Sequence, residues 1–313
     1  MDFVISCYLG NRLYIFLGYG NGTFKLPTTL TTGTNPFNMI VDDFNGDSYA
    51  DIAVTQLGND SIGVLLGLGD STFHSQNSFA VGFGLSSVSV GDFDGDQFPD
   101  LLVPNNVLNT ASVLFGYGNG YFAFPISFPT TIGPLTAVVA DFNHDNLLDF
   151  ALANYGGDSV SIYLGYGNGS FQMLASYPTM TNPWQLAMGD LNSDQHMDLV
   201  VSNCGNGTIS VLLGNGNGTF RAAVHYPVGV CSYGIAMGDM NGDNYLDVVV
   251  VGTFSNFFIV FLGDGTGNFS RRWPFVTDYV PSSLVLYDFN NDDRLDVVIV
   301  HGTGSVIVFL NKG

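Results

Sequence analysis

Six short segments of the sequence carry aspartate and asparagine at the same internal positions. The first runs from Asp43 to Asp51 (DFNGDSYAD) and has an oxygen-bearing side chain at positions 1, 3, 5 and 9. These oxygens, together with the backbone carbonyl at position 7, can surround a Ca²⁺ ion, which takes about six to eight oxygen ligands. We therefore predict one calcium site in each segment, and we call the six segments the Asp loops.

The predicted calcium ligands stand at positions 1, 3, 5, 7 and 9 of each Asp loop, with position 7 contributing its backbone oxygen. In chain order they are Asp43, Asn45, Asp47, Tyr49 and Asp51; Asp92, Asp94, Asp96, Phe98 and Asp100; Asp141, Asn143, Asp145, Leu147 and Asp149; Asp190, Asn192, Asp194, His196 and Asp198; Asp239, Asn241, Asp243, Tyr245 and Asp247; and Asp288, Asn290, Asp292, Arg294 and Asp296. Carboxylates packed into one loop repel each other unless a cation is bound. We therefore expect six Ca²⁺ ions that stabilise the fold.

Other interpretations of these loops explain the pattern less well. An EF-hand needs Gly at position 6, Glu at position 12 and flanking helices. Zinc is disfavoured because the loops contain no Cys, and their His144 and His196 stand at positions 4 and 7, outside the side-chain ligand set. Magnesium, which prefers an octahedral shell with several waters, stays open. Turn capping by Asp and Asn explains one loop easily and six matching loops poorly.

The Asp loops also account for most of the charge of the chain. All 27 acidic residues are aspartates, 19 of them stand at the repeated loop positions, and Asp2 adds a twentieth in register. Six bound Ca²⁺ ions would change the formal charge from −20 to −8. Only seven residues are Lys or Arg, spread along the chain, which excludes a basic patch for nucleic acid. Apolar runs such as Val248–Val251 and Phe257–Leu262 are shorter than the roughly 20 residues that span a bilayer.

The elements that hold these loops follow a repeat of 49 residues. The first aspartates of the loops are separated by that number without an insertion, and their last aspartates repeat likewise back to Asp2. We expect one domain over residues 1–313, with a partial repeat at 1–36 and another at 282–313. The five full repeats are 37–85, 86–134, 135–183, 184–232 and 233–281.

Each repeat contains four short apolar segments bounded by Gly, Asn and Pro, which predicts four strands and almost no helix. We name them A to D; in the first full repeat they are about 37–41, 51–55, 61–66 and 78–81. Four strands per repeat are typical of a β-propeller blade. Counting the strands gives seven blades, with one inner and one outer strand missing. The alternative is six blades, in which the N-terminal D strand completes the last blade. The first twenty residues resemble a signal peptide, but they lack a basic start and fit the strand register.

The turn between strands C and D repeats as Gly-Asn-Gly-[Ser/Thr]-Phe, with Asn-Gly supplying positive φ. It occurs at 20–24, 167–171 and 216–220, with a variant ending at Phe269. We expect its Phe to pack between blades. The Asp loop, an apolar strand and this turn together resemble the FG-GAP/VCBS repeat of the integrin α-subunit propeller and related fungal lectins. The resemblance covers essentially the whole chain and implies a propeller with calcium on one face and partner binding on the other.

The three cysteines are too few for a disulfide framework. The strand directions bring Cys204 and Cys231 to the same face, where a disulfide would join adjacent blades and leave Cys7 unpaired; free thiols are the alternative. Six Asn-x-[Ser/Thr] sequons occur, at Asn21, Asn59, Asn168, Asn206, Asn217 and Asn268. Four of them are also turn signals, so glycosylation stays a hypothesis. Calcium loops and sequons together favour an extracellular or cell-surface setting.

The predicted function is non-catalytic recognition of a protein or glycan through the face opposite the Asp loops. The D–A and B–C loops there vary between repeats, and variable loops on a rigid scaffold are common binding sites. Candidate aromatic contacts are Phe83, Tyr155, Trp184, Tyr233 and Tyr279. The alternative is a carbohydrate-active lyase or hydrolase, although the five histidines share no repeat position and most aspartates are expected to bind metal.

Overall fold

The computed structural model describes residues 1–313, which form twenty-six strands and one 3-10 helix, η1 (Tyr8–Gly10). The strands are β1 (Phe3–Cys7), β2 (Arg12–Phe16), β3 (Thr28–Thr31), β4 (Pro36–Asp42), β5 (Asp51–Gln56), β6 (Ser61–Leu65), β7 (Asn77–Ala80), β8 (Ser89–Gly91), β9 (Asp100–Asn105), β10 (Thr110–Leu114), β11 (Ile126–Pro129), β12 (Pro134–Ala140), β13 (Asp149–Asn154), β14 (Ser159–Gly165), β15 (Phe171–Pro178), β16 (Pro183–Gly189), β17 (Asp198–Asn203), β18 (Thr208–Leu212), β19 (Val224–Pro227), β20 (Ser232–Gly238), β21 (Asp247–Gly252), β22 (Phe257–Gly263), β23 (Phe269–Val276), β24 (Pro281–Tyr287), β25 (Asp296–His301) and β26 (Val306–Phe309). None of the helical segments could cross a bilayer. The expectation of almost no helix is confirmed.

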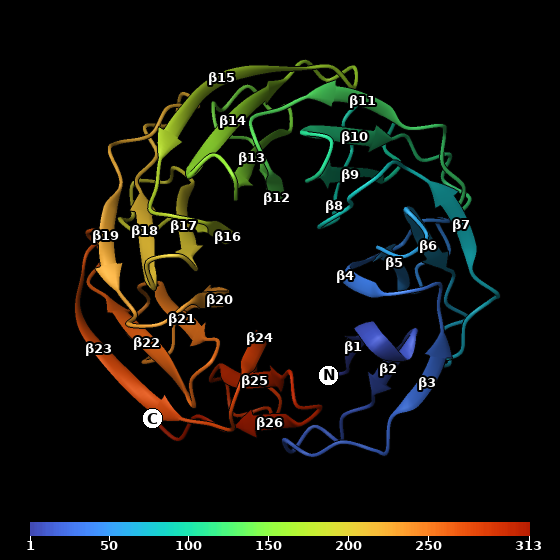
Figure 1. Cartoon of the computed structure of the whole chain (residues 1–313). Coiled ribbons are helices and arrows are strands. Elements are labelled where there is room, and N and C mark those ends of the chain that lie inside the picture. The colour runs from blue at the N-terminus through green and yellow to red at the C-terminus, as the bar shows by residue number, and fades with distance from the viewer.

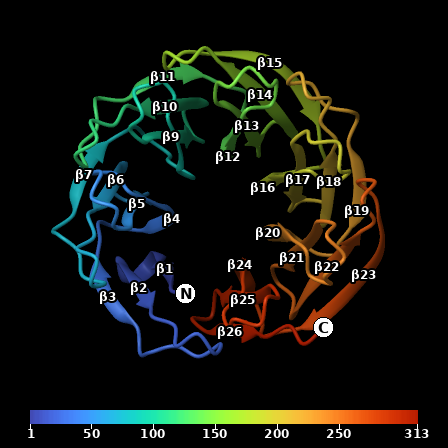
Figure 2. The same ribbon diagram turned by 180° about the vertical axis from the view of Figure 1, so that it is seen from behind.

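The strands form seven antiparallel sheets, or blades, arranged in a ring around a central axis (Figure 1). Blade 1 is β1–β3, blades 2 to 6 have four strands each, and blade 7 is β24–β26. Blade 1 lacks an innermost strand and blade 7 an outermost one, and the two lie side by side in both views (Figures 1 and 2). The seven-bladed prediction is confirmed. The six-bladed alternative is wrong, because β3 pairs with β2 and β26 pairs with β25.

The hydrophobic core lies between neighbouring blades. The second strands β5, β9, β13, β17 and β21 are buried along their whole length, because blades cover both of their faces. One core cluster joins Ile62 and Val64 of blade 2 to Leu101 and Leu114 of blade 3. A strand buried on both faces needs a continuous apolar run rather than an alternating one, which explains sequences such as that of β21, DVVVVG.

The Asp loop of one blade contacts the C–D turn of the next. The backbone N–H of Gly120 donates to the carbonyl of Phe44 at 2.8 Å, and the rings of Phe44 and Phe122 meet edge to face, 5.7 Å apart. The same ring pair recurs between Phe93 and Phe171, Phe142 and Phe220, and Phe289 and Phe24. The prediction that the turn Phe packs between blades is therefore confirmed.

The same contact closes the ring between blades 7 and 1. The N–H of Gly22 donates to the carbonyl of Phe289 at 2.9 Å, and Asn291 Nδ2 donates to the carbonyl of Gly20 at 2.8 Å. Asp loops and C–D turns therefore share one face of the ring, which we call the Asp-loop face. The B–C and D–A loops form the opposite face.

Removing one of these interblade rings is expected to destabilise the propeller. Phe122 is buried, with 7% exposure, and Phe122→Ala should lower the free energy of unfolding by about 3–5 kcal/mol through lost burial and the cavity left behind. Phe124, which is 93% exposed, provides the matched control, and Phe124→Ala should change it by less than about 0.5 kcal/mol. Thermal melts of both variants test this, and equal melting temperatures would contradict it.

Candidate functional site

Each Asp loop is organised by the carboxylate at position 1. In the first loop, Asp43 Oδ1 accepts hydrogen bonds from the N–H of Gly46 and neighbouring residues, and Oδ2 accepts one from Ser48 N–H at 2.7 Å. The residue at position 6 has a left-handed backbone in all six loops, although none is glycine: Ser48, Gln97, Asn146, Gln195, Asn244 and Asp293. Such a conformation costs about 1 kcal/mol or more. The hydrogen bonds from backbone N–H groups to the position-1 carboxylate are the capping bonds that a turn would also make.

The aspartate at position 9 is the most buried acidic group of each loop. All six have 0% exposure: Asp51, Asp100, Asp149, Asp198, Asp247 and Asp296. Asp100 accepts hydrogen bonds from the N–H groups of Phe93 and Gly116, both at 2.8 Å, and neither donor is cationic. A buried carboxylate without a positive partner is costly, so this position favours a bound cation.

The ionisation of these carboxylates reflects their burial. Burial raises the pKa of Asp100, Asp149 and Asp198 to about 6, and neighbouring loop carboxylates act in the same direction. Burial likewise raises the pKa of Asp51 and Asp247. At Asp43, burial also acts to raise the pKa, but hydrogen bonds from four backbone N–H groups outweigh it and lower the pKa. A divalent cation in the loop would favour the ionised form of all of them.

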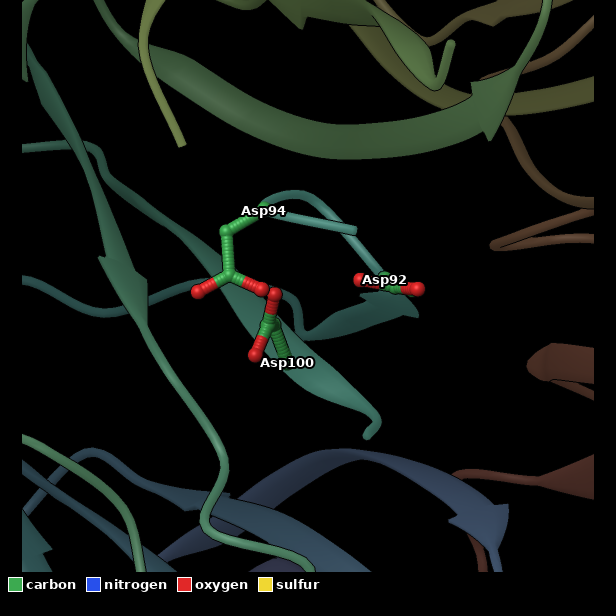
Figure 3. Close-up of side chains that lie close together, drawn as sticks. All are labelled: Asp92, Asp94 and Asp100. Atoms are coloured by element: carbon green, nitrogen blue, oxygen red, sulfur yellow. The ribbon is translucent and has the colours of Figure 1, made fainter. Parts of the chain in front are cut away.

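The second loop brings three carboxylates together. One oxygen from each of Asp92, Asp94 and Asp100 lies within 4.8 Å of the others (Figure 3). Oxygens that bind the same Ca²⁺ ion at about 2.3–2.6 Å can be at most about 5.2 Å apart, so these three fit one ion. The fourth predicted carboxylate, Asp96, lies outside this group and accepts a hydrogen bond from Phe98 N–H at 2.9 Å.

The sixth loop contains an unpaired polar atom at a predicted ligand position. Asn290 Oδ1 is buried and has no hydrogen-bond partner, whereas Asn45 Oδ1 accepts a bond from Asp47 N–H at 2.9 Å. Buried polar oxygens nearly always have a partner. A cation at this loop would supply the missing one, and the donor set of carboxylate, amide and carbonyl oxygens suits Ca²⁺.

The raised pKa values predict how the metal-free protein depends on pH. Asp100, Asp149 and Asp198 bind a proton more tightly when folded, so folding is favoured as the pH falls. The resulting gain in the free energy of unfolding is complete below the pKa of about 4 that these groups have in the unfolded chain, and it is lost as the pH rises through about 6. Denaturant unfolding of metal-free protein should therefore show higher stability at pH 5 than at pH 7, with a smaller difference in Asp100→Asn. Lower stability at pH 5 would contradict the prediction.

The residues at position 7 face away from the loop interior. Their backbone N–H groups donate to the position-5 carboxylate, as Tyr49 does to Asp47 at 2.8 Å. The Tyr49 ring packs against Gly69 of the C–D turn, where a side chain would clash. At the equivalent position, His196 Nδ1 lies 2.9 Å from Nε2 of His144 in the preceding Asp loop. These contacts leave the carbonyl oxygen as the atom that position 7 can offer to an ion.

The aromatic residues predicted for the opposite face divide into two groups. Trp184 stacks on Tyr233 with ring centroids 4.0 Å apart, and Tyr155 meets Trp184 edge to face at 5.7 Å. Trp184 and Tyr233 also line a cavity of about 480 Å³ along the axis of the ring. Phe83 and Tyr279 lie on separate D–A loops and are exposed, at 63% and 59%.

Two hydroxyl–imidazole pairs resemble a nucleophile with its base: Ser210 Oγ with His225 Nδ1, 2.9 Å apart, and Thr277 Oγ1 with His301 Nε2, 2.8 Å apart. Asn203 Nδ2 also donates to Ser210 Oγ at 2.8 Å. The equivalent positions of blade 4 hold Ser161 and Ser176, whose hydroxyl groups are 3.3 Å apart. His225 therefore occupies a place in a cross-strand polar network that another blade fills with serine, and this position indicates a structural role.

Cys204 and Cys231 form a disulfide that joins the B–C loop of blade 5 to the strand connection entering blade 6, and Cys7 is free. All six sequon asparagines are exposed. Those in C–D turns lie on the Asp-loop face: Asn21, Asn168, Asn217 and Asn268. Asn59 and Asn206 lie in B–C loops on the opposite face.

The Asp-loop face also carries exposed aromatic side chains that the sequence reasoning did not name as partner contacts. Tyr19, Tyr117 and Tyr166 stand in the C–D turns with 61%, 58% and 54% exposure. Tyr49 and Tyr245, at position 7 of their Asp loops, are 48% and 41% exposed. Their 49-residue register was the signal that could have identified them.

Comparison with known proteins places this architecture among related repeats. A family model described as the FG-GAP-like repeat matches residues 1–54, 43–103, 141–201, 194–250 and 239–299. The search of curated proteins gives no match.

Several solved structures share the fold at low identity. An Agrocybe aegerita lectin that recognises non-reducing terminal N-acetylglucosamine has a TM-score of 0.60 and 19% identity, with 86% of this chain and 76% of that chain covered. The periplasmic gluconolactonase of Pseudomonas aeruginosa has a TM-score of 0.68 and 14% identity, with coverage of 96% and 80%. BBS1N, solved in complex with ARL6DN, has a TM-score of 0.66 and 11% identity, with coverage of 98% and 91%.

Proposed function

Because the chain belongs to the FG-GAP-like repeat family, we propose that it is a non-catalytic recognition module that six Ca²⁺ ions stabilise and that binds a protein or glycan through the face opposite its Asp loops. The observation that carries this proposal is a difference between the two faces of the ring: one repeats from blade to blade and the other varies. The Asp loops repeat the same bonds from blade to blade, whereas the opposite face presents different side chains in every blade, with Tyr155, Trp184 and Tyr233 in contact. Aromatic groups on a rigid scaffold suit both sugar stacking and partner anchoring.

Two further observations support an extracellular or cell-surface setting. The Cys204–Cys231 disulfide is of a kind that persists in oxidising compartments, and the six sequon asparagines are exposed. Sites of the proposed type would then meet the calcium concentrations of that environment.

The enzyme hypothesis has weaker support in the geometry, although the solved structures of similar fold include a gluconolactonase and a virginiamycin B lyase. Most carboxylates are held in the Asp loops, and the axial cavity is lined by uncharged residues. Acid–base catalysis needs titratable groups within hydrogen-bond reach of a bound substrate.

A glycan array probed with and without Ca²⁺ tests the proposal. A glycan ligand predicts saccharide hits that weaken in chelator, and a protein ligand predicts none. Phe83→Ala and Tyr279→Ala should weaken binding of the partner found, whereas Tyr49→Ala, which removes an aromatic from the Asp-loop face, should not. Binding that depends on Tyr49 and not on the other two residues would overturn the proposed face, and turnover of a bound glycan would overturn the non-catalytic function.

A further inference from the structure

The axial cavity is lined by uncharged polar side chains that recur with the 49-residue spacing. They are Asn38, Ser87, Thr136, Gln185 and Ser283, with Gly234 at the remaining equivalent position. Asn38, Thr136, Gln185 and Ser283 lie on the innermost strands β4, β12, β16 and β24, and Ser87 lies just before β8. We call these five residues the polar ring. Its period shows that the lining is a property of the repeat and not of one loop.

A β-bulge lies in this part of the innermost strand in five of the six blades that have one, the exception being β8 of blade 3. The pairing of strands A and B is irregular between Pro36 and Met39 in blade 2, and between Pro183 and Leu186 in blade 5. Similar irregularities occur in blades 4, 6 and 7. Bulges re-aim side chains and are common beside binding sites.

The members of the polar ring differ in how far the chain itself satisfies their hydrogen-bonding groups. Thr136 Oγ1 donates to the carbonyl of Trp184 at 2.9 Å, and Asn38 Oδ1 accepts from Val88 N–H at 3.0 Å. In contrast, Ser87 Oγ is buried, with 4% residue exposure, and has no partner. The side chain of Gln185, which is partly exposed in the cavity lining, makes no hydrogen bond within the chain, since only its backbone N–H and carbonyl are bonded.

The rest of the lining is aromatic and aliphatic, and none of it carries a charge. Trp184 and Tyr233 form a stacked wall, and Phe37 stands at the equivalent position in blade 2. The lining contains no Asp, Lys, Arg or His, although the chain has a formal charge of −20. A charged ligand would lose its hydration there without gaining a counter-ion.

We propose that the axial cavity binds an uncharged ring compound with one apolar face and several hydroxyl groups, which is the chemistry of a neutral saccharide unit. The apolar face lies against the aromatic wall, and the hydroxyl groups bond to Gln185 and other accessible members of the polar ring. The volume of about 480 Å³ lies within the range of roughly 300–1,000 Å³ that is usual for small-ligand pockets. The proposal rests on the proposed recognition function and adds the location and class of its ligand.

The two tryptophans of the chain allow a direct test. Trp273→Phe leaves Trp184 in the cavity as the only tryptophan, and Trp184→Phe leaves only Trp273 on the outer strand β23. Neutral methyl glycosides of glucose, galactose, mannose, fucose and N-acetylglucosamine, titrated to millimolar concentration, should change the fluorescence of the first variant saturably and leave the second unchanged. Adding Gln185→Ala should weaken binding about 3- to 10-fold through the lost hydrogen bond.

Two results would overturn the inference. One is the absence of a saturable Trp184 signal with every neutral glycoside; the other is equal binding of glucuronate, which carries a charge. The wider recognition function is tested separately by Trp184→Ala, with Phe83→Ala as a matched change outside the cavity. A partner that still binds Trp184→Ala but not Phe83→Ala would keep that function and contradict the cavity as its site.

Discussion

Removal of Ca²⁺ is expected to lower the melting temperature of the protein by about 20 °C. A ligand at one hundred times its Kd stabilises the folded state by about 2.7 kcal/mol per site, so six sites contribute about 16 kcal/mol. Unfolding entropy is about 2.1 cal/mol/K per residue, which for 313 residues converts this free energy into about 20–25 °C. The physical origin is the uncompensated repulsion of buried carboxylates such as Asp100, which has 0% exposure and only neutral donors.

Calorimetry or circular dichroism melts in Ca²⁺ and in excess EGTA measure this shift. Restoring Ca²⁺ to the EGTA sample should recover the higher melting temperature, and Mg²⁺ at the same concentration should recover only part of it. Because the Asp loops also form the contacts between blades, the loss should be cooperative across the ring. An unchanged melting curve in EGTA would mean that hydrogen bonding alone holds the loops.

Asp100→Asn is expected to remove one calcium ion and to cost more stability in Ca²⁺ than in chelator. Asp100 belongs to the group of three carboxylates that fits one ion, and its two oxygens also accept the N–H groups of Phe93 and Gly116. The lost hydrogen bond lowers stability in both conditions. When Ca²⁺ is present at one hundred times its Kd, loss of the ion lowers the free energy of unfolding by about 2.7 kcal/mol more.

Asp70→Asn is the matched control for this substitution. Asp70 is exposed, stands in a C–D turn of the same face and accepts a bond from Thr72 N–H at 3.0 Å. The equivalent position holds Asn21 or Asn119 in other blades, so the same change of charge should be tolerated. Denaturant unfolding of both variants, each measured with and without Ca²⁺, separates the free energy lost with the ion from the free energy lost with the hydrogen bonds. An equal cost of Asp100→Asn in both conditions would show that Asp100 has no part in metal binding.

The 49-residue register made most of the fold predictable. The strands expected at about 37–41, 51–55, 61–66 and 78–81 correspond to β4, β5, β6 and β7 within a residue or so. The register also extends back to Asp2, whose Oδ1 accepts a bond from Gly18 N–H at 2.9 Å as Asp51 does from Gly67. Local turn chemistry and a continuous apolar strand determine these elements, and both are readable from one repeat.

What the sequence did not reveal depends on how separate blades meet. The β-bulge beside Trp184 lies in the pairing of two separate strands, β16 and β17. The closure of the ring through Asn291 and Gly20 joins residues 271 positions apart. The position of Asp96 outside the carboxylate group follows from loop geometry, which the D-x-[DN]-x-D pattern leaves undetermined. Non-local contacts of this kind decide which side chains converge.

The number of Ca²⁺ ions bound per chain distinguishes metal-binding Asp loops from loops held by hydrogen bonds alone. Equilibrium dialysis of metal-free protein against Ca²⁺, with the bound metal measured by atomic emission, should give six ions per chain, one for each Asp loop. Asp100→Asn should give five, and Asp70→Asn should still give six. A value near zero for the unmodified protein would mean that the six loops are hydrogen-bonded turns and that the propeller is held together without metal.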